Sequence, residues 1–271
     1  MPEINALPEV GRTALSDAIR SAAVRAAAVI RAAKSPDAMV PGLSWTAGET
    51  AAHLVNEFVD YTAYAQGRNN PAAGDHPSRR NAEANAAQLR TDPDRDLASL
   101  ADRLLPAVTG FLAVQPPAQP LIVSNGLALG WSTMSSALLG ELVVHGLDIA
   151  RASGQPWRID RSDALLVLDG VLTMMPRYLN RKRAADVRAS IEIRLRGGPR
   201  YLVEIDHGTA VTGRSAAQTR ADCWISADPV AFLKVGFGRT GQWGQIARGK
   251  LLTGGRKPWL ATTFGTVVTR P

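Results

Sequence analysis

The segment from Met134 to Ala150 constrains the fold of this chain most, because as a helix it is apolar around nearly its whole circumference. A helix with that pattern is buried inside a protein. Three of its residues are nevertheless ionisable, Glu141, His145 and Asp148, and their spacings of four and three place them on one face. Burying ionised groups without partners is costly. The sequence therefore predicts a compensating charge here, since a carboxylate and an imidazole one turn apart can bind one cation.

A third ligand is needed for a metal site, and the chain has four histidines. His76 lies in a loop rich in proline and glycine, and His207 lies at a turn after a predicted strand. His53 is the remaining histidine, and it falls on another predicted bundle helix. On a helical wheel it shares a polar face with Glu57 and Asp60, away from the apolar stripe. Periodicity alone therefore predicts that His53 is exposed.

Two interpretations of these residues remain open from spacing alone. A set of His53, Glu141 and His145 leaves a coordination position open, as a catalytic metal site requires. Zinc is the usual metal for such ligands, although imidazole also suits iron and nickel. The alternative is a Glu141–His145 pair joined by hydrogen bonds within a bundle, without a metal, because such pairs four residues apart are common on helices.

The first half of the chain is typical of helices joined by short connections. Helices are predicted at Leu15–Ala33, from the capping box Thr46–Glu49 to Ala65, at Asn81–Val114 with a break at Asp92–Pro93, and at Ser132–Ala152 before Gly154. The segment Gly67–Arg80 is predicted as loop, and Asn125–Gly126 as the turn of a short hairpin. Long helices with short connections favour an up-and-down four-helix bundle.

The pattern changes at Pro156, after which segments of period two appear. Strands are predicted at Ala189–Arg196, Arg200–Asp206 and Ala221–Ser226, and helices at Arg161–Leu179, from Asp228–Pro229 and at Pro258–Phe264. The sheet is expected to be small and largely antiparallel. The chain is thus predicted to be α+β with two domains, residues 1–155 and residues 156–271.

The composition excludes several classes of protein. The formal net charge is +7 and the pI about 10.1, but the basic residues are dispersed and no nucleic-acid-binding module is recognisable. The single cysteine, Cys223, permits no intramolecular disulfide and no cysteine cluster for zinc. The first residues lack the basic and apolar regions of a signal peptide, and no apolar stretch is long enough to span a membrane. We expect a cytoplasmic protein that binds neither nucleic acid nor membrane.

Three further features have simple structural interpretations. Gly236–Gly241 fits the G-x-G-x-x-G pattern, but a helix precedes it where a dinucleotide site needs a strand. Cys223 lies in a predicted strand and is interpreted as a buried structural thiol. Trp45 is interpreted as a packing residue at the entrance of its helix.

Two stretches resemble the mycothiol-dependent maleylpyruvate isomerase family, a branch of the DinB-like metal-binding helical bundles. They are SWTAGETAAHLVNE (Ser44–Glu57) and LLGELVVHGLDIA (Leu138–Ala150). The resemblance implies that His53, Glu141 and His145 bind a divalent metal, most simply zinc. It also implies that the nearby Asp148 helps to hold mycothiol or orients the site.

The second half is similar to the sterol-carrier-protein-like domain that is often fused to such bundles. The similarity lies in Asp222–Gly241 and Ala247–Phe264, which match a helix-loop-strand-helix ending. In relatives the loop that contains Arg239 faces the bundle, so the resemblance implies that Arg239 binds an anionic substrate. An ordinary exposed arginine is the alternative.

The resemblance also implies an activity. The metal would bind the thiolate of mycothiol, the low-molecular-weight thiol of actinobacteria, and the thiolate would attack a small electrophilic substrate. The outcome would be S-transfer or cis-trans isomerisation, by a monomer or a homodimer. Two alternatives remain: a carrier of an apolar ligand with a vestigial metal site, and a nucleic-acid-binding protein whose retention on DNA is sensitive to salt.

Overall fold

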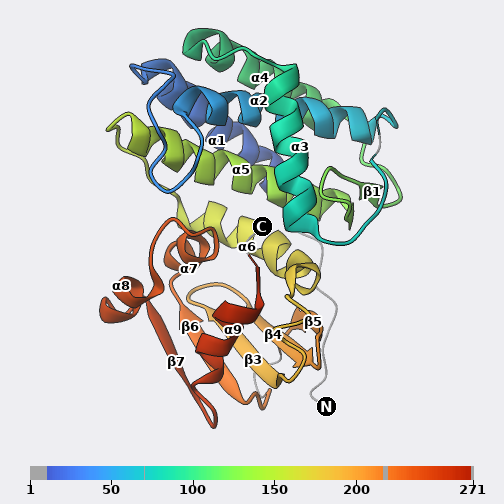
Figure 1. Cartoon of the computed structure of the whole chain (residues 1–271), viewed down its shortest axis with the longest axis vertical. Helices are drawn as coiled ribbons and strands as arrows, with labels where there is room; N and C mark the ends of the chain where they lie inside the picture. The colour runs from blue at the N-terminus through green and yellow to red at the C-terminus, as the bar shows by residue number, and fades with distance from the viewer. Residues whose placement is uncertain (1–10, 70, 216–218, 270–271) are drawn as a thin grey trace. The chain divides into compact units, whose positions relative to one another are not determined.

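The computed structural model describes residues 11–69, 71–215 and 219–269, which fall into two compact units (Figure 1). The first unit ends at Val167 and the second begins at Leu168, so helix α6 (Arg161–Met174) carries the chain from one to the other. A compact unit need not fold independently. The predicted domain boundary after residue 155 therefore stays a prediction.

Four helices form the bundle of the first unit: α1 (Arg12–Ala32), α2 (Ala47–Ala65), α4 (Leu97–Ala113) and α5 (Trp131–Ala152). Helices α1 and α2 each pack against α4 and α5. Their facing side chains are fully buried and include Ile19, Leu54, Phe58, Leu100, Phe111 and Leu138. The predicted four-helix bundle is confirmed. None of the helices among the described residues is both long and apolar enough to cross a membrane.

The predicted ends of the bundle helices and the hairpin are also present. Thr46 and Glu49 form the capping box at the start of α2. Gly154 follows α5 with a φ of +67°, a conformation that glycine adopts without strain. Strands β1 (Leu121–Ile122) and β2 (Ala128–Leu129) pair antiparallel around the Asn125–Gly126 turn.

Helix α3 (Pro77–Thr91) departs from the prediction in two ways. It begins at Pro77, within the predicted loop. Proline suits the first turn of a helix, because the backbone N–H that it lacks would have no partner within the helix there. Helix α3 also leaves the bundle: Figure 1 shows α3 running across the other helices rather than beside them, and it contacts α2. The predicted helix Asn81–Val114 is thus two helices with different directions. Their break falls at Asp92, as predicted, since Pro93 disfavours helical backbone at the preceding residue.

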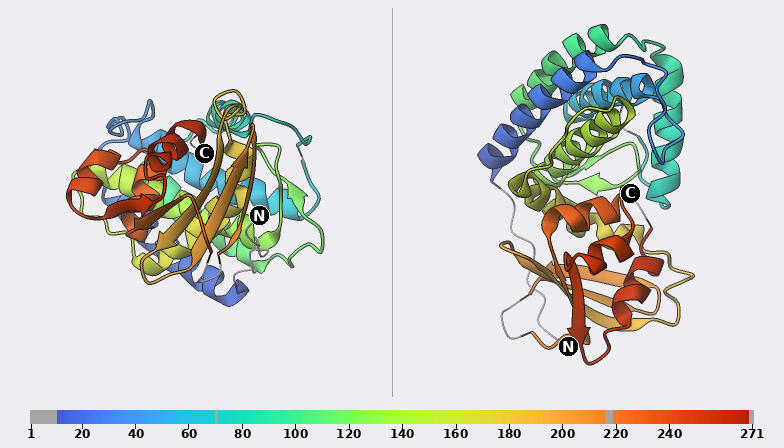
Figure 2. Two further views of the ribbon diagram at one scale, coloured as in Figure 1. Left: turned by 90° about the horizontal axis from the view of Figure 1, so that it is seen from below. Right: turned by 90° about the vertical axis from the view of Figure 1, so that its left-hand side faces the viewer.

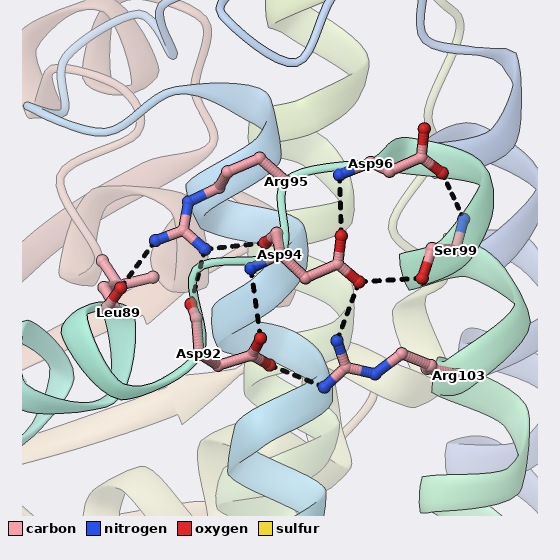
Figure 3. Close-up of polar contacts among 7 residues, drawn as sticks. All are labelled: Leu89, Asp92, Asp94, Arg95, Asp96, Ser99 and Arg103. Atoms are coloured by element: carbon pink, nitrogen blue, oxygen red, sulfur yellow. Dashed lines mark hydrogen bonds and ion pairs between the residues drawn. The ribbon is translucent and has the colours of Figure 1, made fainter.

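A network of charged side chains holds the corner between α3 and α4 (Figure 3). Arg103 on α4 donates to Asp92 at 2.6 Å and to Asp94 at 2.9 Å. Arg95 donates to the backbone oxygens of Asp92 at 2.7 Å and of Leu89 at 2.8 Å, which satisfies a carbonyl at the end of α3. The connection between the two helices is therefore fixed by hydrogen bonds from two arginines.

The second unit is built on a five-stranded sheet of order β5-β4-β3-β6-β7. The strands are β3 (Arg188–Leu195), β4 (Arg200–Asp206), β5 (Thr209–Arg214), β6 (Cys223–Ala227) and β7 (Leu251–Gly255). Only the β3–β6 pair is parallel. Helix α9 (Leu260–Val267) packs against β3 and β6, and Figure 2 shows the helices of this unit on one side of the sheet. The predicted α+β class with a largely antiparallel sheet is confirmed.

Three elements of this unit, β5, α8 and β7, were not predicted from the pattern, although the resemblance implied a strand within Ala247–Phe264. Strand β5 follows β4 through a two-residue turn in which His207 and Gly208 have φ values of +45° and +82°. Such a turn has positive φ at both positions, and the glycine after His207 was the signal that could have revealed it. Helix α8 (Gln242–Ala247) is short and follows α7 (Pro229–Gly236), which Asp228 caps. Helix α6 is also shorter than predicted and ends in the 3-10 turn Met175–Tyr178.

Removing the corner arginine by Arg103→Ala should lower the free energy of unfolding by about 1 kcal/mol at pH 7, since the lost hydrogen bonds are partly exposed. The Arg103 hydrogen bond lowers the pKa of Asp92 below 3.8. A carboxylate whose pKa is lower in the folded than in the unfolded protein stabilises the fold at any pH above the unfolded-state pKa. This stabilisation is lost as the pH falls through the folded-state pKa. The difference between variant and wild type should therefore narrow below pH 3.8, as urea unfolding would measure.

Arg20→Ala, at an exposed position of α1, is the matched control and should change stability little. An Arg103→Ala deficit that is independent of pH would contradict the assigned role of the corner.

Candidate metal centre

Three side chains from two bundle helices converge on one point of the first unit. His53 lies on α2, and Glu141 and His145 lie one turn apart on α5. One ligand atom from each residue lies within 4.8 Å of the others. The Oε2 atom of Glu141 is 3.3 Å from His53 Nε2 and 3.0 Å from His145 Nε2. The structure thus brings together the three residues that were predicted as ligands.

The predicted exposure of His53 is wrong, because its side chain is only 3% exposed. Helix α2 has no solvent-facing polar side at this level. The polar face that carries His53 and Glu57 packs against α5 and α3, so both residues are buried. A helical wheel shows which residues share a face, but it does not show whether a second helix covers that face. Glu141 retains 24% exposure, so the ligand set is not sealed from solvent.

Each histidine has a hydrogen-bond acceptor at its second ring nitrogen. Nδ1 of His145 is 2.9 Å from Asp148 Oδ2, and a carboxylate can only accept. Nδ1 of His53 is 3.3 Å from the side-chain oxygen of Gln88. Both Nδ1 atoms therefore carry the hydrogen, which leaves the two Nε2 atoms to face Glu141. Metal-binding histidines commonly have this arrangement, in which the second nitrogen donates to a carboxylate or carbonyl.

A positive charge at the centre of these atoms would stabilise them. With both Nδ1 atoms protonated, the neutral imidazoles of His53 and His145 present lone pairs to the Glu141 carboxylate, and lone pairs repel. A proton on Nε2 of His145 would relieve the repulsion at that ring but not at His53, and protonating both Nε2 atoms would place two cations in a buried site. A single divalent cation satisfies all three atoms at once. The donor set of two imidazoles and one carboxylate is one that zinc accepts.

The pKa values of the metal-free site are shifted by the same close approach of imidazoles and carboxylates. Burial lowers the pKa of His145, but hydrogen bonds to Asp148 and Glu141 outweigh it and raise the pKa to about 9. Burial raises the pKa of Glu141, yet the hydrogen bonds from His145 and His53 hold it well below its ordinary value. Both shifts favour a cation beside an anionic carboxylate.

Two of the three distances between the ligand atoms match those of a tetrahedral zinc site. Tetrahedral ligands at about 2.0–2.1 Å from zinc lie about 3.3 Å from one another. The two distances that involve Glu141 are 3.3 and 3.0 Å. The third pair, one ring nitrogen from each histidine, lies within 4.8 Å. Binding zinc would therefore draw the two imidazoles toward about 3.3 Å from one another, and its fourth position would stay open for a further ligand.

Trp45 has a larger part in the site than its predicted packing role. Its ring lies 5.0 Å from the His53 ring and 6.1 Å from the His145 ring, centroid to centroid. The backbone oxygen of Trp45 accepts from the Val40 amide at 2.9 Å, which fixes the approach to α2. The Trp45 ring thus packs against both imidazoles.

Close packing on α5 fixes the segment that carries two of the ligands. Trp157 lies so near Gly146 that an added Cβ would come within 2.3 Å of its indole ring. The indole N–H of Trp157 donates to the backbone oxygen of Val143 at 3.0 Å. Only glycine permits this contact directly after His145, so α5 has little freedom to rotate.

The structure places the other predicted site residues as follows. Asp148 is fully buried and contacts His145, so its position suits orienting that ring. Arg239 lies in the second unit, where its guanidinium donates to the backbone oxygen of Phe237 at 2.6 Å; its substrate role stays a prediction. Gly236–Gly241 follows a helix rather than a strand, and Cys223 is buried in β6, both as expected.

Three site residues were not predicted from the sequence: Gln88, and through it Glu57 and Asp60 on α2. The Gln88 amide nitrogen donates to Asp60 at 2.6 Å and lies 3.4 Å from a Glu57 oxygen. Burial raises the pKa of Glu57 to about 7. No motif in the sequence around Gln88 marks it as a site residue, and it lies 35 residues from His53 along the chain. No local pattern could have revealed this contact.

Comparison with solved structures gives matches that extend over most of the chain. The crystal structure of a mycothiol-dependent maleylpyruvate isomerase is 12% identical, covers 92% of this chain and 95% of that chain, and has a TM-score of 0.54. The two proteins therefore share a fold. Sterol carrier protein 2 is 23% identical over 34% of this chain and 83% of that chain, with a TM-score of 0.28.

A further match, to a double mutant of a sec-alkyl sulfatase, has a TM-score of 0.35 and 11% identity. It covers 71% of this chain, which spans 30% of the length of that structure. No curated protein matches the chain.

Residues 4–150 match the sequence profile of the mycothiol maleylpyruvate isomerase N-terminal domain. The matched range contains His53, Glu141, His145 and Asp148. It is more than half of the 271 residues, and the chain therefore belongs to the mycothiol maleylpyruvate isomerase N-terminal domain family.

Proposed function

We propose that this protein is a zinc- and mycothiol-dependent enzyme that transfers or isomerises a small electrophilic substrate. The observation that carries the proposal is the convergence of His53, Glu141 and His145, with both Nδ1 atoms already committed to acceptors. Membership of the family supports mycothiol as the thiol. The shared fold with a maleylpyruvate isomerase structure is consistent with this chemistry.

The three ligands leave one position for a thiol, as a catalytic zinc site requires. Zinc bound there would lower the pKa of a coordinated thiol, so that the thiolate is available at neutral pH. The protein's own residues fix the geometry: Asp148 holds the ring of His145, and Trp45 packs against both imidazoles. The partial exposure of Glu141 gives small molecules a route to the ligand set.

Several finer points remain predictions. A substrate with a carboxylate would suit Arg239 and the net charge of +7. A direct role of Asp148 in holding mycothiol is a second prediction, beside its contact with His145. A cytoplasmic location, a monomeric or homodimeric state and the lack of nucleic-acid binding are likewise predicted.

Replacing a single ligand by His53→Ala or Glu141→Ala should remove bound zinc and lower mycothiol-dependent turnover by more than about 100-fold. This loss exceeds the roughly 10- to 100-fold effect that is usual when a group hydrogen-bonded to a metal ligand is removed. The measurements are metal content after purification without added zinc, and thiol transfer to a panel of electrophiles with mycothiol, glutathione and bacillithiol. His207→Ala is the matched control, because His207 is exposed in the second unit and should leave both quantities unchanged.

Wild-type protein without metal that co-purifies with lipid would contradict the proposed enzyme and favour a carrier of apolar ligands. Turnover that survives in both ligand variants would contradict a role for the metal.

Zinc affinity should rise with pH, because zinc must displace the proton that the raised pKa of about 9 keeps on His145. One displaced proton gives about tenfold tighter binding per pH unit below that value. Chelator competition from pH 6 to 9 measures this slope. Asp148→Asn removes a contact that raises the His145 pKa, so its slope should flatten at a lower pH. Equal affinity at pH 6 and pH 9 in the wild type would contradict the proton displacement.

A further inference from the structure

Gln88 joins helix α3 to a candidate ligand through a hydrogen bond. Its side-chain oxygen lies 3.3 Å from Nδ1 of His53. Its amide nitrogen lies 2.6 Å from Asp60 Oδ2 and 3.4 Å from Glu57 Oε1. Gln88 therefore bridges the buried histidine and two carboxylates of α2.

The two carboxylates decide which way the Gln88 amide points. A carboxylate oxygen accepts hydrogen bonds, and so the NH₂ end of the amide must face Asp60 and Glu57. The oxygen end is then left for His53, and an oxygen can only accept. His53 must therefore donate from Nδ1, and a neutral His53 then presents the lone pair of Nε2 to Glu141 and His145.

The two histidines of the site are thus oriented by different groups. His145 donates to Asp148, a carboxylate on the same helix, three residues away. His53 donates to a neutral amide that reaches it from α3. The orientation of His53 consequently depends on the position of α3, which the corner between α3 and α4 fixes through Arg95 and Arg103.

We propose that Gln88 is a positioning residue of the metal centre, which holds His53 as the Nδ1–H tautomer with Nε2 directed at the metal. This inference rests on the proposed function. Gln88 itself does not contact the metal or the substrate. Its loss should weaken zinc binding by about 10- to 100-fold, as for other groups that orient metal ligands.

The test compares wild type with Gln88→Met, which has a similar length but no hydrogen-bonding groups. Gln66→Met makes the same change at an exposed position next to α2 and is the matched control. Zinc affinity is measured by chelator competition. Cobalt is then substituted for zinc, and proton NMR is used to count the exchangeable, paramagnetically shifted imidazole N–H signals.

The wild type and Gln66→Met should show two such signals, one from each histidine, and bind zinc equally. Gln88→Met should show one signal, because the His53 N–H exchanges with water, and weaker zinc binding. Two signals with wild-type affinity in Gln88→Met would overturn the inference while leaving the metal site intact.

The wild-type spectrum tests the inference even if Gln88→Met fails to fold. A single slowly exchanging N–H signal in wild-type protein that binds cobalt would overturn the role of Gln88. Wild-type protein that binds neither zinc nor cobalt would overturn the proposed function, and the role of Gln88 with it.

Discussion

The first unit brings two imidazoles and a carboxylate together at one point, where a shared positive charge would stabilise all three. Helices α2 and α5 each bring polar groups into the bundle at a level where neighbouring side chains are apolar. An isolated carboxylate at that depth would be costly, and so would two adjacent imidazoles with lone pairs facing it. The same constraint explains the positions of Asp148 and Gln88, because each histidine must direct one ring nitrogen inward and donate from the other to an acceptor.

The position of α3 links this centre to the outside of the bundle. Helix α3, in which only Pro77 and Asn85 are buried, has little apolar surface to hold it in place. Its hold comes instead from the arginine network at the corner with α4 and from the Gln88 bridge at the site. The corner between α3 and α4 thus contributes to the orientation of His53.

Several features were predictable because they depend on short-range patterns. The capping box at Thr46, the break at Asp92–Pro93 and the stop at Gly154 are set by backbone chemistry within a few residues. The period-two segments of the second half predicted three strands of the sheet. Strand β5 was missed because its signal was the His207–Gly208 turn rather than its own residues. The alternating pattern of β3 also does not show that Glu192 is buried, since Arg194 covers it on the same face of the strand and forms an ion pair with it.

The sequence by itself determined the helical bundle, the α+β second half and the pairing of Glu141 with His145, because all of these rest on spacing along one element. The tertiary structure alone decided that His53 is buried, that Trp45 packs against both imidazoles, and that Gln88 joins the site. The physical reason is that a helical wheel records directions around one axis. Whether a polar face meets water or a second helix depends on how separate helices pack, and that depends on the whole chain.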